Sequence, residues 1–387
     1  MTIPPAYPDI RATVDGHDLH FIFAGSARLE AILNLIDSAR QSVRMCFYIF
    51  GSDHVATCVA DALVEARNRG VDVMLIVDGF GTGPRPNALF ATMVEAGVEF
   101  ARFVPRFGRR FLLRNHQKMI VVDGHAAMIG GFNIDASYFP DNGVADGWHD
   151  LALHIKGPAA QRLEAYFDAL MIWMRASKPG LLSLVALLAR HSEREGALRL
   201  LFGGPSRRLN GITRNLRVAI ASAQRIDMIQ AYFAPNWGFL RKLGRVARRG
   251  DFNLITAAIS DNRTTIAAAR HCYRRLLVRG TKIYEYLPQK LHMKLIVIDD
   301  IVYVGSANFD MRSLYLNTEN VLRIEDAALA EKMRGFFQLH IPNCQSIDPV
   351  GHRLKSTPFA RIRWLFGYLL VAVVDYGIAS KLNWKAP

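Results

Sequence analysis

Two stretches of the chain carry histidine, lysine and asparagine at nearly the same spacing. They are NHQKMIVVDGHAAMIGGFNID, residues 115–135, and LHMKLIVIDDIVYVGSANFD, residues 291–310. Each contains His-x-Lys, four apolar residues, an Asp and a turn of small residues ending in Asn-x-Asp. The shared positions are His116, Lys118, Asp123, Gly131, Asn133 and Asp135 in the first copy, and His292, Lys294, Asp299, Ser306, Asn308 and Asp310 in the second.

The spacing within each copy indicates which side chains act together. The apolar run predicts a short buried strand, on which residues two apart share a face, so each His points the same way as its Lys. Asp123 and Asp299 have the opposite parity, so we include them among the catalytic residues in a supporting role rather than as groups that attack a substrate. Asp135 and Asp310 are expected to pin the turns through hydrogen bonds to the backbone.

Imidazole and ammonium groups together favour an anionic substrate. A Lys beside each His disfavours a metal ion, because the ammonium would repel it and is not an ordinary ligand. A phosphate diester fits: one His attacks phosphorus and the other protonates the leaving oxygen, while the lysines and the turn amides hold the charge. One copy alone would be interpreted as a solvated strand end, but two matching copies favour a catalytic site.

This pattern resembles the signature of the phospholipase D superfamily, which has two His-x-Lys-x4-Asp motifs, each followed by a Gly-Gly/Ser-x-Asn turn. The likeness is closest to bacterial cardiolipin synthases of the shorter type and extends over most of residues 25–344. It implies a bilobal fold with one site between the lobes and no metal or cofactor. It also implies a ping-pong reaction through a phosphohistidine, with His116 as nucleophile and phosphatidylglycerol as donor and acceptor. Phosphatidylethanolamine is the alternative donor.

The composition is compatible with a phospholipid membrane as partner, but it does not distinguish a membrane from a nucleic acid. The 387 residues are 51% hydrophobic, enough for two domains with substantial cores. Lys and Arg outnumber Asp and Glu by 48 to 34, which points to an anionic membrane or a nucleic acid. The four cysteines show no CxxC spacing, so we expect reduced thiols in a cytoplasmic setting.

The order of helical and strand patterns predicts an α/β fold built by internal duplication. Gly70, Gly97 and His116 recur after 180, 183 and 176 residues as Gly250, Gly280 and His292. We therefore expect two similar lobes, each a mixed sheet flanked by helices, with the site at their interface. The expected divisions are a flexible lead-in (1–24), the first lobe (25–176), a connection (177–197), the second lobe (198–345) and a basic, apolar C-terminal segment (346–387).

The repeat also identifies a pair of acids outside the short motif. The strand after each turn begins with Asp150 in DLALHI and with Glu319 in ENVLRI. A carboxylate bound to imidazole Nδ1 would fix the tautomer and leave Nε2 facing phosphorus, and the resemblance implies such an acid. The alternative is a carboxylate at a strand start with no catalytic partner.

Two stretches outside the repeats suggest membrane contact. ARFVPRFGRRFLLRN, residues 101–115, suits a lip around the substrate opening, and its alternative is a solvated loop with buried rings. The candidates for membrane and substrate contact are Phe103, Arg106, Phe107, Arg109, Arg110 and Trp364. The segment WLFGYLLVAVV, residues 364–374, is too short to span a bilayer, so it either lies at the surface or packs on the second lobe.

The first residues contain three prolines and no apolar core, so we expect neither a secretory signal nor an anchor there. We expect a phosphatidyltransferase located peripherally on the cytoplasmic face of the bacterial inner membrane, with no partner protein and with nucleic acid as the less favoured partner. A phosphodiesterase or nuclease that uses water, and a silent membrane-binding protein, are the alternatives.

Overall fold

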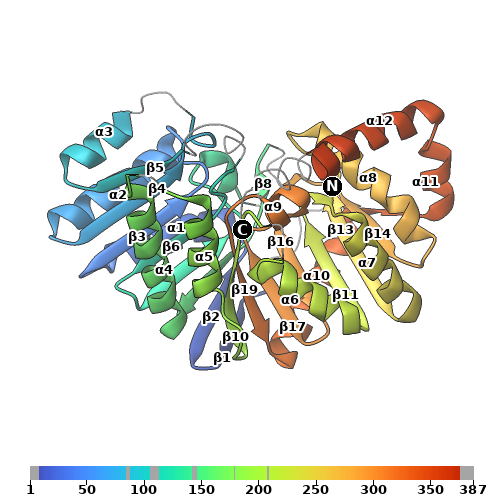
Figure 1. The fold of residues 1–387 in the computed structure, drawn as a ribbon, viewed down its shortest axis with the longest axis horizontal. Coiled ribbons are helices and arrows are strands. Elements are labelled where there is room, and N and C mark those ends of the chain that lie inside the picture. The colour runs from blue at the N-terminus through green and yellow to red at the C-terminus, as the bar shows by residue number, and fades with distance from the viewer. Residues whose placement is uncertain are drawn as a thin grey trace.

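The computed structural model describes residues 8–83, 88–104, 113–141, 146–177, 179–206 and 209–374. The chain forms two lobes that lie side by side, each built on an eight-stranded mixed sheet with helices around it (Figure 1). Short buried runs such as MIVV and LIVI form central strands, as their apolar, β-branched composition predicts.

The first lobe holds the sheet with the strand order β1-β2-β9-β7-β6-β3-β4-β5. Its strands are β1 (Ile10–Val14), β2 (His17–Ile22), β3 (Ser42–Phe47), β4 (Asp72–Asp78), β5 (Glu99–Phe103), β6 (Met119–Val122), β7 (Ala126–Gly130) and β9 (Ala152–Lys156). Its helices are α1 (Gly25–Asp37), α2 (His54–Asn68), α3 (Ala88–Glu95) and α4 (Pro158–Arg175). The two-residue strand β8 (Trp148–His149) lies outside this sheet.

The second lobe holds the sheet with the order β10-β19-β17-β16-β11-β13-β14-β20. Its strands are β10 (Leu198–Gly203), β11 (Arg225–Gln230), β13 (Asp251–Ala257), β14 (Lys282–Tyr286), β16 (Lys294–Ile298), β17 (Ile301–Gly305), β19 (Glu319–Glu325) and β20 (Cys344–Ile347). Its helices are α6 (Gly211–Ser222), α7 (Trp237–Arg249), α8 (Arg263–Leu277), α9 (Met311–Tyr315) and α10 (Ala327–His340). Helix α5 (Leu181–His191) connects the lobes, and β12 (Phe233–Ala234), β15 (Lys290–Leu291) and β18 (Phe309–Asp310) form short pairings.

The two sheets confirm the predicted duplication. In both, three parallel strands (β3-β4-β5 and β11-β13-β14) are followed on the other side by an antiparallel series (β6-β7-β9 and β16-β17-β19). The first His-x-Lys segment directly precedes β6, which lies next to β3. The second ends at Lys294, the first residue of β16, which lies next to β11. The repeat therefore places the two motifs at corresponding points of two similar sheets.

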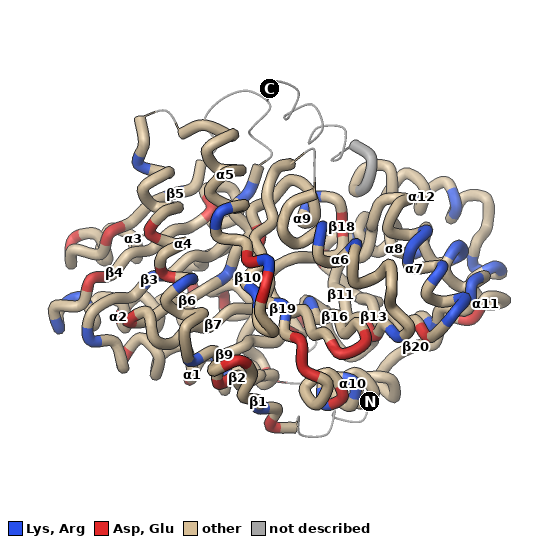
Figure 2. Tube along the Cα trace, turned by 60° about the horizontal axis from the view of Figure 1, so that its bottom comes forward, with Lys and Arg blue, Asp and Glu red and all other residues tan. Residues whose placement is uncertain are grey.

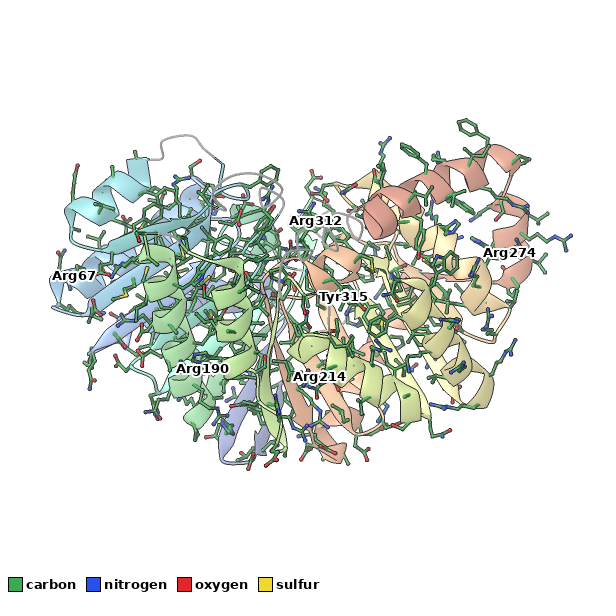
Figure 3. All side chains as sticks on the ribbon, viewed as in Figure 1. Arg67, Arg190, Arg214, Arg274, Arg312 and Tyr315 are labelled. Carbon is green, nitrogen blue, oxygen red and sulfur yellow. The ribbon has the colours of Figure 1, made fainter. Side chains whose placement is uncertain are left out.

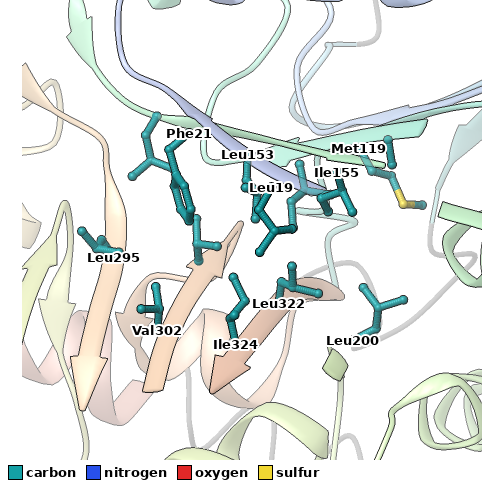
Figure 4. Close-up of a cluster of buried hydrophobic side chains, with 14 of the residues drawn as sticks. Leu19, Phe21, Met119, Leu153, Ile155, Leu200, Leu295, Val302, Leu322 and Ile324 are labelled. Carbon is teal, nitrogen blue, oxygen red and sulfur yellow. The ribbon is translucent and has the colours of Figure 1, made fainter. Parts of the chain in front are cut away.

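The lobes share one hydrophobic core. Its members come from the inner faces of both sheets and from α4 and α10. Leu19, Phe21 and Leu153 of the first lobe face Val302, Leu322 and Ile324 of the second across this core (Figure 4). Because the lobe interface is packed like a domain interior, it holds the two motifs in a fixed relation.

The N-terminal prediction is wrong in part. The expected lead-in over residues 1–24 contains β1 and β2, which extend the first sheet by pairing with each other and with β9. Leu19 and Phe21 are buried in the core. The alternation in IRATV and HDLHF was a usable strand signal.

The C-terminal segment packs on the second lobe and also exposes apolar side chains. It forms α11 (Pro349–Lys355), α12 (Pro358–Tyr368) and one further helical turn (Leu369–Val374). Trp364 is buried and stacks on His352 with ring centroids 5.1 Å apart, so its predicted membrane contact is wrong. On the other side of α12, Phe359, Ile362 and Phe366 are 75%, 67% and 62% exposed.

Candidate active site

The two His-x-Lys segments meet at the seam between the lobes, where backbone pairing crosses from one lobe to the other. Asn115 forms a bridge with Thr318, and the His116 amide donates to the Thr318 carbonyl at 2.9 Å. Correspondingly, Leu291 pairs with His149, and the His292 amide donates to the His149 carbonyl at 2.8 Å. Each histidine therefore lies beside the residue that precedes the acid of the other lobe.

This pairing brings each imidazole to the carboxylate of the opposite lobe. His116 Nδ1 lies 2.9 Å and 3.0 Å from the two carboxylate oxygens of Glu319. His292 Nδ1 lies 2.6 Å from Asp150 Oδ2. Both acids are fully buried, and their position at Nδ1 leaves Nε2 of each ring for the substrate. The structure thus brings together the four residues that the repeat aligned, with the partners exchanged between lobes.

The acids differ in their surroundings. Burial raises the pKa of Glu319 to about 8, although the charges of Lys118 and Lys294 and the Ser306 hydroxyl oppose the shift. Burial also acts on Asp150, but the Lys294 charge, the hydrogen bond from His292 and the Arg28 charge outweigh it, and the pKa of Asp150 falls below its ordinary value. Asp150 is therefore held in its charged form more firmly than Glu319.

Both motif lysines are buried beside their histidines, with exposures of 0% for Lys118 and 3% for Lys294. Lys118 Nζ donates to the His116 carbonyl at 2.6 Å, and Lys294 Nζ lies 2.9 Å from His292 Nδ1. Burial lowers the pKa of Lys118 to about 7 and that of Lys294 to about 8, against the opposing charges of nearby acids. An anion bound between them would restore their positive charge.

Both imidazoles are held in the neutral form. Burial and the charges of Lys118, Lys294 and Arg312 place the pKa of His116 well below its ordinary value. Burial and Lys294 lower the pKa of His292 to about 3, although Asp150 opposes the shift. A neutral imidazole at neutral pH is competent as a nucleophile or a base.

The small residues of the two turns lie against the acids, and the turn asparagines line the cavity. An added Cβ on Gly131 would lie 2.7 Å from Asp150 Oδ1, so glycine is required there by close approach. At the equivalent position, the Ser306 hydroxyl donates to Glu319 Oε2 at 2.5 Å. Asn133 and Asn308 both line the cavity, as expected, and Asn133 Oδ1 also accepts from the Ile49 amide.

Asp123 and Asp299 do not line the cavity. Asp123 accepts hydrogen bonds from the backbone amides of residues 40–42, and Asp299 accepts from those of Gln224 and Arg225. Both have positive φ, 53° and 46°, at the turn on the far end of β6 and β16. Their inclusion among the catalytic residues is therefore corrected: they tie the hairpin to the neighbouring strand. Asp135 and Asp310 accept hydrogen bonds from backbone amides, as predicted, but they cap the helical segments that follow the turns, Ala136–Tyr138 and α9.

A cavity of about 1460 Å³ opens over the two histidines. Aromatic rings surround His292: those of Tyr138, Trp148 and Tyr232 lie 5.1, 5.2 and 6.4 Å from its ring. Tyr48 lies 5.0 Å from the His116 ring. The cavity is also lined by Arg102, Arg114, Arg312, Asn317, Asp261 and Asp310.

The predicted lip lies mostly outside the described residues. Arg106, Phe107, Arg109 and Arg110 fall there. Phe103 is buried, and its ring stacks 6.0 Å from Trp173 while it also lines the cavity. Its burial at the end of β5 contradicts the predicted membrane contact, whereas its place in the cavity wall agrees with the predicted substrate contact.

Sequence reasoning missed the aromatic wall and Arg312. Tyr138 ends a short 3-10 helix (Ala136–Tyr138), Trp148 begins β8 and Tyr232 lies in the loop before β12, and no spacing rule connects them. Arg312 lies two residues after Asp310, and its closeness to the second motif was the sequence signal that could have identified it. His149, next to Asp150, pairs with His340 instead of facing the cavity, with 2.8 Å between the Nε2 atoms.

Within the described ranges, no group of three or more His, Cys, Asp or Glu side chains is arranged to hold a metal ion. The ammonium groups beside both imidazoles give the independent physical argument against a dication. Metal independence of the reaction stays a prediction.

Comparison with known proteins identifies the family. A family model described as "Cardiolipin synthase, PLD-like domain" matches residues 32–171 and 216–341, the two repeated lobes. The chain therefore belongs to the phospholipase D superfamily of enzymes, and to its cardiolipin synthase-like domain family.

Individual relatives carry the same name. The chain is 33% identical over 304 residues to "Cardiolipin synthase 2" of Bacillus cereus, covering 76% of this chain and 59% of that protein. It is 29% identical to "Cardiolipin synthase A" of Edwardsiella ictaluri, covering 88% of this chain and 72% of that one. The chain thus spans about three fifths of the length of the Bacillus relative.

Solved structures share the fold at low sequence identity. A phosphatidylserine synthase from Haemophilus influenzae aligns with a TM-score of 0.67 at 13% identity, over 90% of this chain and 94% of that one. A polyphosphate kinase from Porphyromonas gingivalis aligns at 0.60 and 14% identity, over 92% and 53%. These two proteins are named for different activities but share the fold, so the fold alone does not indicate the reaction.

Proposed function

We propose that this protein is a cardiolipin synthase-like phosphatidyltransferase, which joins two phosphatidylglycerol molecules into cardiolipin and glycerol. The observation that carries the proposal is the exchanged pair of His–acid contacts at the floor of one cavity, each accompanied by a buried lysine. The cardiolipin synthases among its relatives support the choice of lipid substrate.

In the first step, His116 Nε2 attacks the phosphorus of the donor lipid. An N–P bond forms, the P–O bond to the glycerol headgroup breaks, and His292 in its protonated form gives its proton to the departing oxygen. The substrate's negative charge favours that protonated form. Lys118, Lys294 and the turn amides stabilise the equatorial oxygens.

In the second step, neutral His292 takes the proton from a hydroxyl of a second phosphatidylglycerol. The hydroxyl oxygen bonds to phosphorus, the N–P bond to His116 breaks, and cardiolipin leaves. Asp150 stabilises the imidazolium of His292 in both steps through its contact at Nδ1. The assignment of His116 as the nucleophile follows the family resemblance.

Expression of the chain in a bacterial host that lacks cardiolipin tests the proposal. Lipid analysis should show cardiolipin with the wild-type chain and none with a His116→Ala variant produced at the same level. Phosphatidic acid alone would indicate a hydrolase that uses water, and no change in lipids would indicate a nuclease or a silent binding protein. Either result contradicts the proposal.

We further propose that the protein binds peripherally to the cytoplasmic face of the bacterial inner membrane. Among the described residues, no helix is long and apolar enough to cross a membrane. Three exposed apolar side chains, Phe359, Ile362 and Phe366, line one side of α12. Val371, just beyond this helix, contributes to the cavity wall.

The distribution of basic residues supports the same membrane contact. Lys and Arg gather over α7, α8 and α11 at the outer end of the second lobe (Figure 2). Apolar contact with a bilayer and attraction to anionic headgroups would act together there. Replacing Phe359, Ile362 and Phe366 by Ser should weaken binding to anionic vesicles, while turnover of a soluble short-chain diester is retained. Unchanged vesicle binding would contradict this membrane contact.

A further inference from the structure

Arg28 is a buried cation that contacts residues of the candidate site without lining the cavity. It lies in the first turn of α1, its side chain is 1% exposed, and it is not part of the cavity wall. Removing a charge from water is costly unless polar groups compensate it. The groups around this guanidinium therefore indicate what the charge does.

The Arg28 guanidinium donates to three backbone carbonyls. Nη1 donates to the carbonyl of Phe23 at 2.5 Å and to that of Asp150 at 2.7 Å, and Nη2 donates to that of Tyr138 at 2.6 Å. Two of these acceptors belong to residues that contact His292. Asp150 bonds to His292 Nδ1, and the Tyr138 ring lies 5.1 Å from the imidazole. One side chain of α1 thus fixes the backbone of two groups around this histidine.

The positive charge of Arg28 also acts on the Asp150 carboxylate. Burial would raise the pKa of Asp150, but the Lys294 charge, the hydrogen bond from His292 and the Arg28 charge hold it below its ordinary value. Burial lowers the pKa of Lys294 to about 8 and that of His292 to about 3, so both groups change their charge between pH 3 and 8. A guanidinium stays protonated over this whole range. Arg28 is therefore the permanent charge among them.

The second lobe makes corresponding backbone contacts with a neutral side chain. Asn210, which caps the start of α6, donates through Nδ2 to the carbonyls of Gly204 at 3.2 Å and Leu314 at 2.8 Å. Leu314 lies in the helical segment after the second motif, as Tyr138 does after the first. Such contacts therefore do not require a charge by themselves, and the buried charge is a feature of the lobe that carries Asp150.

The stability of the helix does not explain the buried arginine either. Arg28 and Arg214 are each the fourth residue of their helices, and their amides donate to the carbonyls of Ala24 at 3.1 Å and Asn210 at 3.0 Å. Arg214 is exposed on α6 (Figure 3). A cation in the first turn of a helix opposes the helix dipole. Burial of Arg28 thus comes from its contacts with the site, and Arg214 offers a matched control.

We propose that Arg28 is a positioning residue: it anchors the backbone of Asp150 and Tyr138 to α1 and places a permanent positive charge near the Asp150 carboxylate. Through that carboxylate it acts on His292. The inference rests on the proposed function, which assigns the acid–base steps to His292, and it extends that function to a residue that does not touch the substrate.

Steady-state kinetics of cardiolipin formation tests this role. Arg28→Met removes the charge and the three donated hydrogen bonds, and kcat should fall by roughly tenfold because the carboxylate is displaced but still present. KM should stay unchanged, because Arg28 lies outside the cavity wall. Arg28→Lys keeps the charge and should keep kcat within about threefold of the wild-type value. Arg214→Met, the matched control, should leave kcat unchanged.

The decisive measurement is the effect of Arg28→Met in an Asp150→Asn background. Substitutions at independent sites have additive effects, whereas residues that act through one another do not. If Arg28 acts through the carboxylate, Arg28→Met should slow the Asp150→Asn protein by less than about threefold. A loss as large as in the wild-type background would overturn the proposal, because a general packing effect persists without the carboxylate. A higher KM with unchanged kcat would also overturn it.

Melting curves of every variant control for folding. If Arg28→Met does not fold, Arg28→Gln takes its place, because glutamine can donate to a carbonyl but carries no charge. Equal kcat values for Arg28→Gln and Arg28→Lys would then overturn the proposal, since they would show that the charge has no effect.

The wild-type protein distinguishes failure of this inference from failure of the proposed function. Wild-type protein that forms no cardiolipin but hydrolyses a soluble short-chain diester would contradict the proposed function. The same Arg28 variants would then be measured on the diester, because Asp150 and His292 take part in its hydrolysis as well. Wild-type protein that turns over neither substrate would contradict both proposals.

Discussion

The two histidines occupy equivalent positions in repeated lobes, yet the walls around them differ. His292 lies among Tyr138, Trp148 and Tyr232 and is bound to an acid whose pKa is lowered. His116 lies on the side of Arg312 and is bound to an acid whose pKa is raised. The two repeats thus share the histidine but differ in its surroundings, which would allow two chemically similar groups to take different roles.

The largest effect should come from the histidines themselves. His116→Ala should abolish turnover, because the covalent route then has no nucleophile. His292→Ala should slow turnover by ~10²–10⁴, the usual contribution of acid–base catalysis, and should still form the intermediate from a donor with a good leaving group. Rates come from lipid product analysis, and mass spectrometry locates the phosphorylated residue. Phosphate on a residue other than His116 would reverse or overturn the assigned roles.

The next largest difference is expected between substitutions of the two acids, Asp150 and Glu319. Asp150→Asn removes a charge that supports the His292 imidazolium, so we expect a loss of ~10²–10³ in kcat. Glu319→Gln mimics a carboxyl that burial already holds near its neutral form, so the loss should stay within about tenfold. Steady-state kinetics of both variants, with melting curves as a control for folding, checks the order. Equal losses would show that the two acids act alike despite their surroundings.

A smaller difference should separate the two turns. Gly131→Ala forces a methyl group to within 2.7 Å of Asp150 Oδ1, so the carboxylate must move, and misplacement on this scale costs up to about 10²-fold in rate. Ser306→Ala removes one hydrogen bond to Glu319 without a clash, and should cost less than about tenfold. A milder effect at Gly131 than at Ser306 would contradict the close approach seen in the first lobe.

The smallest effect should be that of chelators. Both lobes place an ammonium beside the imidazole, so treatment with EDTA should leave the rate unchanged once any effect on vesicle structure is controlled with a detergent-solubilised substrate. A loss of activity that one particular divalent ion restores would contradict both halves of the site.

Much of the fold and most residues of the candidate site could be predicted from the sequence alone. The apolar runs after Lys118 and Lys294 predicted central strands, and the repeated order of patterns predicted two similar lobes. The acids followed from aligning the repeats. These features are local or periodic, so residue type and spacing suffice to find them. The same method failed for β1 and β2, since proline near the start outweighed their alternation, and for Trp364, whose burial depends on His352 and α8.

The sequence by itself determined which groups belong to the candidate site: two His-Lys pairs, two acids and two small-residue turns. Only the tertiary structure decided that each histidine takes its acid from the other lobe, across separations of 203 residues for His116 and Glu319 and 142 for His292 and Asp150. It also decided that one wall is basic and the other aromatic. The physical reason is that these contacts are made by the packed interface between lobes, whose geometry depends on the whole shared core and on no local pattern.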